Sequence, residues 1–326
     1  MLLNEIKDGI YIIHENPEWI PPFEEAFKRA GVPFGEILLT QGSINLDKEP
    51  PKGVFWSRMS ASSHTRNNAY SKEYARAVLS WLEAHNRRVI NGLNVLEFEV
   101  SKVAQYLALN KAGFRTPKTL AVFGKEDLLT RAKELKAPFI SKHNQGGKGL
   151  GVRRFDSFED FKNYVHSTEF EEPVDGITLL QEYIVSKEFF ITRAEFIDSK
   201  FHYAVRVDTS AGSFELCPAD ACNVDEAPKA PALAGAMCDI GGGDKFSLRT
   251  DISANTPLIV QLEGFLKAHK IEVAGVEFIE DINNEFVVYD INTNTNYNKA
   301  VEAKAKVRAA DKIVEFLHTQ LKKMKG

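Results

Sequence analysis

A chain of 326 residues is long enough for about two or three packed domains, and 44% hydrophobic with 26% charged residues is an ordinary globular composition. With 41 basic and 45 acidic side chains, the formal net charge of −4 disfavours a general nucleic-acid or anionic-membrane binder. The first residues lack the pattern of a signal peptide, and no apolar run reaches membrane-spanning length, so no membrane partner is expected.

The first third of the chain alternates between short apolar runs and helical patterns. Gly31 ends the first helix, and Asn91–Gly92 marks a turn after the last strand. This alternation predicts an α/β domain over residues 1–95, built on an open parallel sheet. Strands are expected at residues 10–13, 37–39, 54–56 and 89–90, and helices at 22–30 and 71–86.

Residues 96–185 are expected to form an α+β unit. A helix over 101–111 ends at Gly113, and Ser157 with Asp160 matches a capping box before a later helix. Strands are expected at 119–123, 138–142 and 179–184, with a further helix near 127–135.

Residues 186–326 are expected to form a second α+β unit. Its long irregular stretch, 210–251, is typical of a functional segment. This stretch holds Cys217, Cys222 and Cys238, which fit free thiols in the cytoplasm better than a disulfide framework or a zinc site. Strands are expected at 188–197, 201–207, 272–279 and 286–291, one helix from Thr256–Pro257, and a closing helix over 299–323.

A cluster of glycines, Gly146, Gly147, Gly149 and Gly151, follows directly after a predicted strand. Glycines let backbone N–H groups approach a polyphosphate, and the spacing matches neither the P-loop nor the dinucleotide fingerprint. The pattern predicts a flap between two antiparallel strands that covers a nucleotide; a glycine-rich hairpin without a ligand is the alternative. Lys142 ends the apolar strand before the flap, where a phosphate would be a partner for a buried cation. An exposed lysine at the strand end is the alternative.

Two single acidic residues, Glu277 and Asp290, interrupt apolar strands that a turn at 281–284 joins. An antiparallel hairpin would bring the two carboxylates together, where they repel unless a positive charge lies between them. Asn292 points to the same face as Asp290 and adds a neutral oxygen. Such a set of hard oxygen ligands predicts a Mg²⁺ site, unless salt bridges to lysines account for the acids.

The order of these motifs resembles the ATP-grasp superfamily, especially ligases related to the ribosomal-protein glutamate ligases. The resemblance covers about residues 90–300 and implies an ATP-grasp fold, in which an open parallel-sheet domain precedes two α+β subdomains that clasp ATP. Asn91 followed by Ser101–Lys102 resembles the family's helix whose lysine touches phosphate, and FISKHNQGGKGLGV resembles the second-lysine strand and flap. LLQEYI resembles the adenine hinge, and GVEFI followed by YDIN resembles the metal-binding acids.

The resemblance also implies roles for single residues. Glu277, Asp290 and Asn292 would hold Mg²⁺, with Mn²⁺ as an alternative ion. Arg206 and then Arg193 would contact the γ-phosphate or the acyl phosphate beside Lys142, although a surface ion pair is an alternative for Arg193. The nucleotide would be bound by Lys102, Lys142, Gly146, Gly147, Gly149, Gln181, Glu182, Tyr183, Ile184 and Glu188, with the hinge backbone on adenine and Glu188 on ribose.

The implied activity is ATP-dependent ligation of a carboxylate to an amine through an acyl phosphate. The substrates would be amino acids or peptides, and Arg58, His64 and Arg66 are candidates to bind a substrate carboxylate, with exposed loop charges as the alternative. A kinase acting on a hydroxyl and a nucleotide-binding regulator without turnover are alternatives on the same fold. A homo-oligomer is compatible with the sequence.

Three features depart from the family pattern. Asp290 stands where glutamate is usual, and no glycine follows Asn292. Residues 213–222 also occupy a loop that often carries basic groups. The number of metal ions and the acceptor substrate are therefore open.

Overall fold

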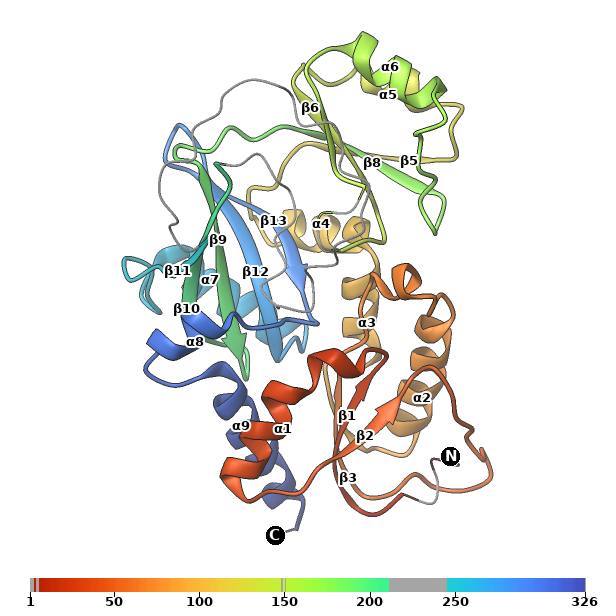
Figure 1. Ribbon diagram of the computed structural model, residues 1–326, viewed down its shortest axis with the longest axis vertical. Coiled ribbons are helices and arrows are strands. Elements are labelled where there is room, and N and C mark those ends of the chain that lie inside the picture. Colours follow the sequence, from red (N-terminus) through yellow and green to blue (C-terminus); the bar gives the residue numbers. More distant parts are fainter. Residues whose placement is uncertain (1–2, 4–5, 148, 150, 211–244, 326) are drawn as a thin grey trace.

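The computed structural model describes residues 3, 6–147, 149, 151–210 and 245–325, which build three sheets with their covering helices (Figure 1). The N-terminal sheet lies at the bottom of this view, a four-stranded antiparallel sheet at the top, and a five-stranded sheet between them. Cys217, Cys222 and Cys238 lie outside the described residues, and so does most of the long stretch 210–251.

The N-terminal sheet is entirely parallel, as the alternating pattern predicts, and its strand order is β2-β1-β3-β4. Its apolar side chains pack against α1 on one face and against α2 and α3 on the other. The elements are β1 (Gly9–His14), α1 (Pro21–Ala30), β2 (Gly35–Leu38), β3 (Gly53–Ser57), α2 (Ser71–Ala84), β4 (Arg88–Ile90) and α3 (Leu93–Val100), with short 3-10 helices η2 (Pro17–Trp19) and η3 (Ser63–Arg66).

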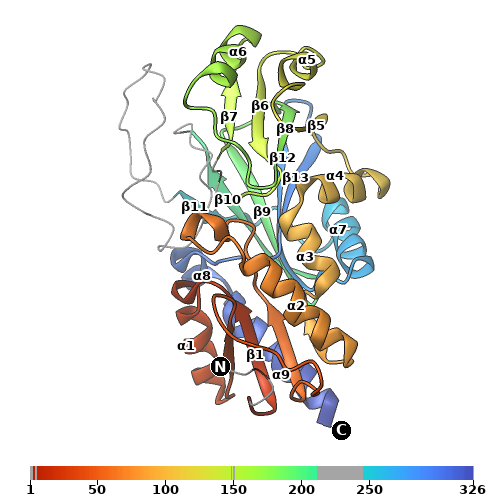
Figure 2. The same cartoon turned by 90° about the vertical axis from the view of Figure 1, so that its right-hand side faces the viewer.

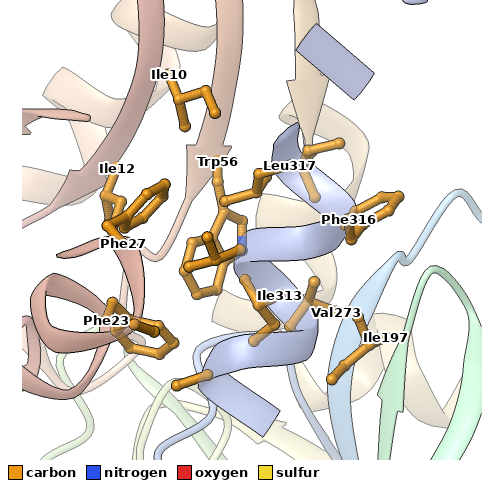
Figure 3. Close-up of a cluster of buried hydrophobic side chains, with 14 of the residues drawn as sticks. Ile10, Ile12, Phe23, Phe27, Trp56, Ile197, Val273, Ile313, Phe316 and Leu317 are labelled. Atoms are coloured by element: carbon orange, nitrogen blue, oxygen red, sulfur yellow. The ribbon is translucent and has the colours of Figure 1, made fainter. Parts of the chain in front are cut away.

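The C-terminal helix returns to the N-terminal sheet. In Figure 3, Ile313 and Leu317 lie beside Trp56, and Ile197 and Val273 border the same cluster. The last helix therefore joins the core of the first sheet to strand ends of the last sheet, which no local pattern reveals.

The prediction of a single closing helix over 299–323 was wrong, because the chain forms α8 (Lys299–Lys304) and α9 (Ala309–Lys325). Ala305 is extended after α8. The Glu302 carboxylate accepts hydrogen bonds from Ala309 N at 3.1 and 3.0 Å and so satisfies a donor at the start of α9.

The middle sheet has the order β5-β8-β6-β7, and all of its pairs are antiparallel. Phe139, Phe161 and Leu180 form its core with the helices on one face. Ser157 accepts a hydrogen bond from Asp160 N at 3.1 Å, as the capping box predicts. The elements are β5 (Thr119–Phe123), α5 (Leu128–Ala132), β6 (Phe139–His143), β7 (Arg153–Phe155), α6 (Phe158–His166) and β8 (Ile177–Glu182).

The C-terminal sheet is antiparallel, with the order β11-β10-β9-β12-β13. One face packs on α3, α4 and α7, which Figure 2 shows beside the sheet. Ala194 and Phe196 point into that core, so Arg193 and Glu195 point to the opposite face. The elements are α4 (Lys102–Lys111), β9 (Phe190–Ile197), β10 (Lys200–Asp208), β11 (Phe246–Leu248), α7 (Pro257–Ala268), β12 (Val273–Glu280) and β13 (Phe286–Asn292).

Other short elements were absent from the sequence prediction or differ from it in extent. Helix α3 and strand β11 are short and were missed, and α5 is shorter than the predicted helix over 127–135. The domain boundaries near residues 95 and 185 stay predictions. Within the described part of the chain, no helix has the length and apolar character needed to span a membrane.

Candidate functional site

Three charged side chains form a row across neighbouring strands of the C-terminal sheet. In the strand register, Glu277 on β12 lies opposite Arg193 on β9 and opposite Asp290 on β13, so all three share one face. This register confirms the predicted hairpin and the pairing of its two acids. Arg193 Nη1 donates to Glu277 Oε1 at 3.0 Å, and both side chains are buried.

A β-bulge enlarges this polar row. The register shifts between Glu277 and Phe278, so that Tyr289 and Asp290 together lie opposite Glu277. Tyr289 OH donates to Glu277 Oε2 at 2.9 Å, and Asn292 Nδ2 lies 3.3 Å from Oε1. Both oxygens of Glu277 thus have donors.

Arg193 is held by acids on two sides and lies over the backbone of a glycine. Its Nε atom donates to Glu195 Oε1 at 2.7 Å, and its Nη2 atom donates to Thr295 Oγ1. Although burial lowers it, the carboxylates of Glu195 and Glu277 raise the pKa of Arg193 above its ordinary value. A Cβ atom at Gly275 would lie 2.7 Å from both Nε and Nη2, so only glycine leaves room for the guanidinium.

Two lysines from separate elements converge on this face. Lys102 begins α4, and its Nζ atom donates to Asp290 Oδ1 at 2.5 Å. Lys142 ends β6, and its Nζ atom donates to Tyr106 OH at 2.5 Å and lies 6.0 Å from the centre of the Tyr289 ring. Burial, with a smaller contribution from Lys102, lowers the pKa of Lys142 to about 7. Among the residues that the structure describes, no carboxylate lies within ion-pair distance of Lys142, which leaves this cation open to an anionic ligand.

The acids and the asparagine fit a hard divalent cation. Glu277, Asp290 and Asn292 offer oxygen atoms from adjacent strands, which is the ligand type that Mg²⁺ prefers. Across the described ranges, no group of three or more His, Cys, Asp or Glu side chains is placed to hold a metal. A cation here would therefore take its remaining ligands from phosphate oxygens and water, as Mg²⁺ often does.

Side chains of α4 cap the free edge of β13. Gln105 Oε1 accepts from Ile291 N at 3.0 Å, and Gln105 Nε2 donates to Ile291 O at 2.9 Å. Tyr106 OH donates to Tyr289 O at 2.8 Å. An edge strand needs partners for its outward backbone groups. The same contacts align α4, and hence Lys102, with the acidic strand. Sequence reasoning missed Gln105 and Tyr106, because neither stands in a chemical motif.

The glycine loop connects antiparallel strands β6 and β7, as predicted. Gly149 has φ +74°. Gly151 has φ +73°, and a Cβ atom on it would lie 2.9 Å from the His143 ring. The half-buried Gly146 and Gly147 follow β6 after Asn144 and Gln145. Glycine is therefore required where the loop turns.

The predicted hinge links β8 to the C-terminal sheet. Gln181 Nε2 donates to Thr119 Oγ1 at 2.7 Å, and Glu182 Oε1 accepts from Lys118 N at 2.9 Å. Among the other candidates, the ring of Tyr183 has its centre 4.5 Å from Arg154 Cζ, Ile184 is half-buried, and Glu188 is exposed.

Arg206 lies away from the acidic row. On β10, Val205 pairs with Arg193 while Arg206 pairs with Thr192, so Arg206 points to the opposite face of the sheet. Its guanidinium lies 4.1 Å from the centre of the Phe190 ring and 3.7 Å from Glu188. The structure thus brings Arg193 to Glu277 but does not bring Arg206 there.

Arg58, a predicted substrate residue, is enclosed at the carboxyl end of β3. Its guanidinium donates to Thr295 O at 2.7 Å, to Asn296 Oδ1 at 2.9 Å and to Trp19 O at 3.3 Å. It also lies 4.6 Å from the centre of the Phe23 ring. Burial lowers the pKa of Arg58 to about 10. Arg58 therefore holds chain segments together.

The other two substrate candidates lie in the 3-10 helix η3. Arg66 forms an ion pair with Glu15, and its guanidinium lies 4.6 Å from the centre of the Trp19 ring. His64 is partly buried, and desolvation lowers its pKa. This helix follows Ser62, which a Cβ atom on Gly147 of the glycine loop would approach to 3.4 Å. His64 and Arg66 thus lie on the part of the N-terminal domain that faces the loop.

Comparisons with known proteins give matches in structure alone. The sequence matches no family model and no curated protein. The ATP-grasp ligase PsnB, solved with a minimal precursor, Mg and ADP, is 15% identical with a TM-score of 0.63, over 96% of this chain and 97% of that one. A RimK domain ATP-grasp protein from Sphaerobacter thermophilus is 14% identical with a TM-score of 0.64, over 94% and 98%. The D-cycloserine synthetase DcsG is 14% identical with a TM-score of 0.64, over 96% and 100%. At these identities the likeness establishes a shared fold.

Proposed function

Because the chain has the ATP-grasp fold, we propose that it is an ATP- and Mg²⁺-dependent ligase that joins a carboxylate to an amine. The observation that carries this proposal is the convergence of Lys102 and Lys142 on the acidic row of Glu277 and Asp290. Two cations beside two acids suit a metal-bound polyphosphate. PsnB, solved with Mg and ADP, supports the same assignment of ligands.

ATP would lie between the middle and C-terminal sheets. The hinge at Gln181, Glu182, Tyr183 and Ile184 would hold adenine, and the exposed Glu188 would reach the ribose. Gly146, Gly147 and Gly149 would cover the phosphates beside the two lysines. A bound Mg²⁺, held by Glu277, Asp290 and Asn292, would neutralise phosphate charge.

The proposed reaction has two steps. A substrate carboxylate takes the γ-phosphoryl group of ATP, which gives an acyl phosphate and ADP. An amine then attacks the acyl carbon, phosphate leaves, and the amide forms with loss of the amine proton. Catalysis of phosphoryl transfer depends mainly on positioning and charge, so no protein nucleophile is needed. Lys142 would hold a proton beside the phosphate, and the glycine loop would exclude water from the acyl phosphate.

We propose amino acids or peptides as substrates. PsnB was solved with a precursor, and DcsG is a D-cycloserine synthetase, so enzymes with this fold act on both sizes of molecule. His64 and Arg66 are the candidates to meet the substrate, because they lie beside the glycine loop. Arg58 is enclosed and is left out of this role.

Release of ADP and phosphate from Mg·ATP, measured against a panel of amino acids and peptides, tests the proposal. We expect turnover that requires both a carboxylate and an amine, with a loss of at least about 100-fold in Lys142→Ala. A phosphorylated product that needs no amine would identify a kinase instead. Absence of turnover with every substrate, or undiminished turnover in Lys142→Ala, would contradict the ligase assignment.

A further inference from the structure

One carboxylate, that of Glu99 near the end of α3, joins two segments far apart in the sequence. Its Oε1 atom accepts a hydrogen bond from Ala61 N at 3.1 Å. Its Oε2 atom accepts from Thr293 N at 2.7 Å, from Thr293 Oγ1 at 2.9 Å and from Asn294 N at 3.3 Å. Glu99 thus connects the segment after β3 to the residues that directly follow Asn292.

The Ala61 end of this connection continues into the glycine loop. Gln145 Nε2 donates to Ala61 O at 3.2 Å. Gly147 lies against the next residue, since a Cβ atom on it would be 3.4 Å from Ser62 Cβ. Ala61 therefore contacts the loop through its carbonyl oxygen and Glu99 through its N–H group.

An ionised carboxylate suits this position better than an amide. Both oxygens of Glu99 face N–H donors, and a glutamine would turn an NH₂ group toward one of them. Desolvation raises the pKa of Glu99 above its ordinary value, although the hydrogen bonds from Ala61 and Thr293 and the charge of Lys102 act in the opposite direction. A glutamine would keep its amide oxygen toward Thr293 and Asn294, because that side offers more donors. It would then lose the hydrogen bond from Ala61 N.

We propose that Glu99 is a positioning residue for the nucleotide site, an inference that rests on the function proposed above. By holding Ala61 and Thr293 at once, Glu99 fixes the glycine loop relative to the strand of Asp290 and Asn292. Phosphates under the loop then meet the acidic strand in one geometry. Glu99 acts through these backbone groups and does not itself contact the phosphates.

Hydrogen–deuterium exchange of the protein without ligand tests the connection itself. In Glu99→Gln we expect faster exchange in a peptide covering residues 58–64 and much less change in one covering 289–297, because the amide oxygen stays with Thr293. Glu97→Gln is the matched control: it lies on the same helix, and among the described residues its carboxylate pairs only with the exposed Arg76. This control should leave both peptides unchanged.

Binding of ADP in the presence of Mg²⁺, measured by calorimetric titration, tests the positioning role. We expect Glu99→Gln to weaken ADP binding about tenfold. The substitution removes the charge-assisted hydrogen bond from Ala61 N, and such bonds are among the stronger hydrogen bonds in proteins. Gln145→Ala cuts the same connection on the loop side and should also weaken binding, without altering exchange at 289–297. The double variant should bind ADP no less tightly than the single variant with the lower affinity, because either substitution alone already breaks the connection to the loop.

Two sets of results would overturn the inference. Equal exchange in wild type and Glu99→Gln at residues 58–64, or strictly additive losses of affinity in the double variant, would show that Glu99 does not link the loop to the strand. Wild type that binds no ADP at all would remove the proposed function together with this role. Wild type that binds ADP with an affinity unchanged in both single variants would remove the positioning role alone. If Glu99→Gln does not fold, Gln145→Ala still decides the question through its affinity.

Discussion

Two buried arginines that both donate to Thr295 are held in different ways by their other partners. Arg58 donates to the backbone oxygens of Trp19 and Thr295 and to the side chain of Asn296, and burial lowers its pKa to about 10. Arg193 donates to the carboxylates of Glu195 and Glu277, which raise its pKa despite burial. One guanidinium is tied by neutral acceptors, and the other by acids.

This difference separates a structural tie from a binding site. Neutral acceptors that hold Arg58 have no charge to offer a ligand, so this contact is expected to be permanent. Of the acids that hold Arg193, Glu277 is a proposed ligand of Mg²⁺, and in that proposal the neighbouring Lys102 and Asp290 would exchange each other for phosphate and metal. The predictions below test that contrast.

Arg193→Met should have the largest effect on stability. Removal of one partner from a buried ion pair costs about 3–5 kcal/mol, because Glu195 and Glu277 lose their cation. Desolvation already raises the pKa of Glu277 and the charge of Arg193 lowers it, so without Arg193 this pKa rises further and the loss grows as pH increases through it. Urea unfolding at pH 5 and 7.5 should show a smaller loss at the lower pH. An equal loss at both pH values would contradict this account of Arg193.

Arg58→Met should destabilise by about 2–3 kcal/mol, because several buried acceptors lose their donor. The acceptors of its hydrogen bonds are backbone oxygens and an amide oxygen, none of which titrates, so this loss should change less between pH 5 and 7.5 than that of Arg193→Met. The control is Arg29→Met, which removes an exposed pair with Asp311 and should cost less than about 1 kcal/mol. A loss in Arg58→Met that depends on pH as steeply as the loss in Arg193→Met would remove the contrast between the two arginines.

Gly275→Ala should cost about 1–3 kcal/mol, because the new Cβ atom would displace the Arg193 guanidinium, 2.7 Å away. Gly264→Ala is the matched control within helix α7, where a Cβ atom meets nothing within 4 Å. That substitution should stabilise by about 0.5–1 kcal/mol through its helix propensity. Thermal unfolding of both variants gives the comparison, and equal effects would show that the glycine is not needed for Arg193.

Lys142 should make stability depend on pH in the alkaline range. Its pKa is about 7 in the folded protein and about 10.4 in the unfolded chain, so the unfolded state binds the extra proton between these values. Stability of the ligand-free protein should therefore rise with pH across this window, by about 1 kcal/mol between pH 7.5 and 8.5. Lys142→Met should lack this contribution. Parallel pH profiles of the two proteins would contradict the lowered pKa.

Arg206→Ala should have the smallest effect, because its side chain lies on the other face of the sheet and forms a long, exposed ion pair with Glu188. Such pairs contribute about 0–1 kcal/mol, so the KM for ATP should change by less than about threefold. A large fall in kcat in this variant would show that Arg206 takes part in the reaction despite its place on the other face of the sheet.

Features with a local pattern could be predicted from the sequence. The alternating strands and helices predicted the parallel sheet, and lone acids in apolar strands predicted the pairing of Glu277 with Asp290. Lys142 and the glycine loop followed from residue type and position alone. Each of these features depends on neighbours within a few residues.

Features set by register and tertiary packing could not be predicted. Arg193 and Arg206 were correctly expected on adjacent strands, but an offset of one residue in the pairing places them on opposite faces. The bulge at Tyr289 is an irregularity of register within the hairpin, and the contacts of Glu99 join residues far apart in the chain. The docking of α9 on the first sheet depends on the same long-range packing.

The central claim is that the face of Lys142, Glu277 and Asp290 binds a metal-bound nucleotide. Its most direct test is a calorimetric titration of the wild type, Lys142→Met and Glu277→Gln with ADP, in Mg²⁺ and again in excess chelator. We predict saturable binding by the wild type that weakens at least about tenfold without Mg²⁺ and in either variant. Binding that is absent in the wild type, or that neither chelator nor substitution alters, would contradict the claim.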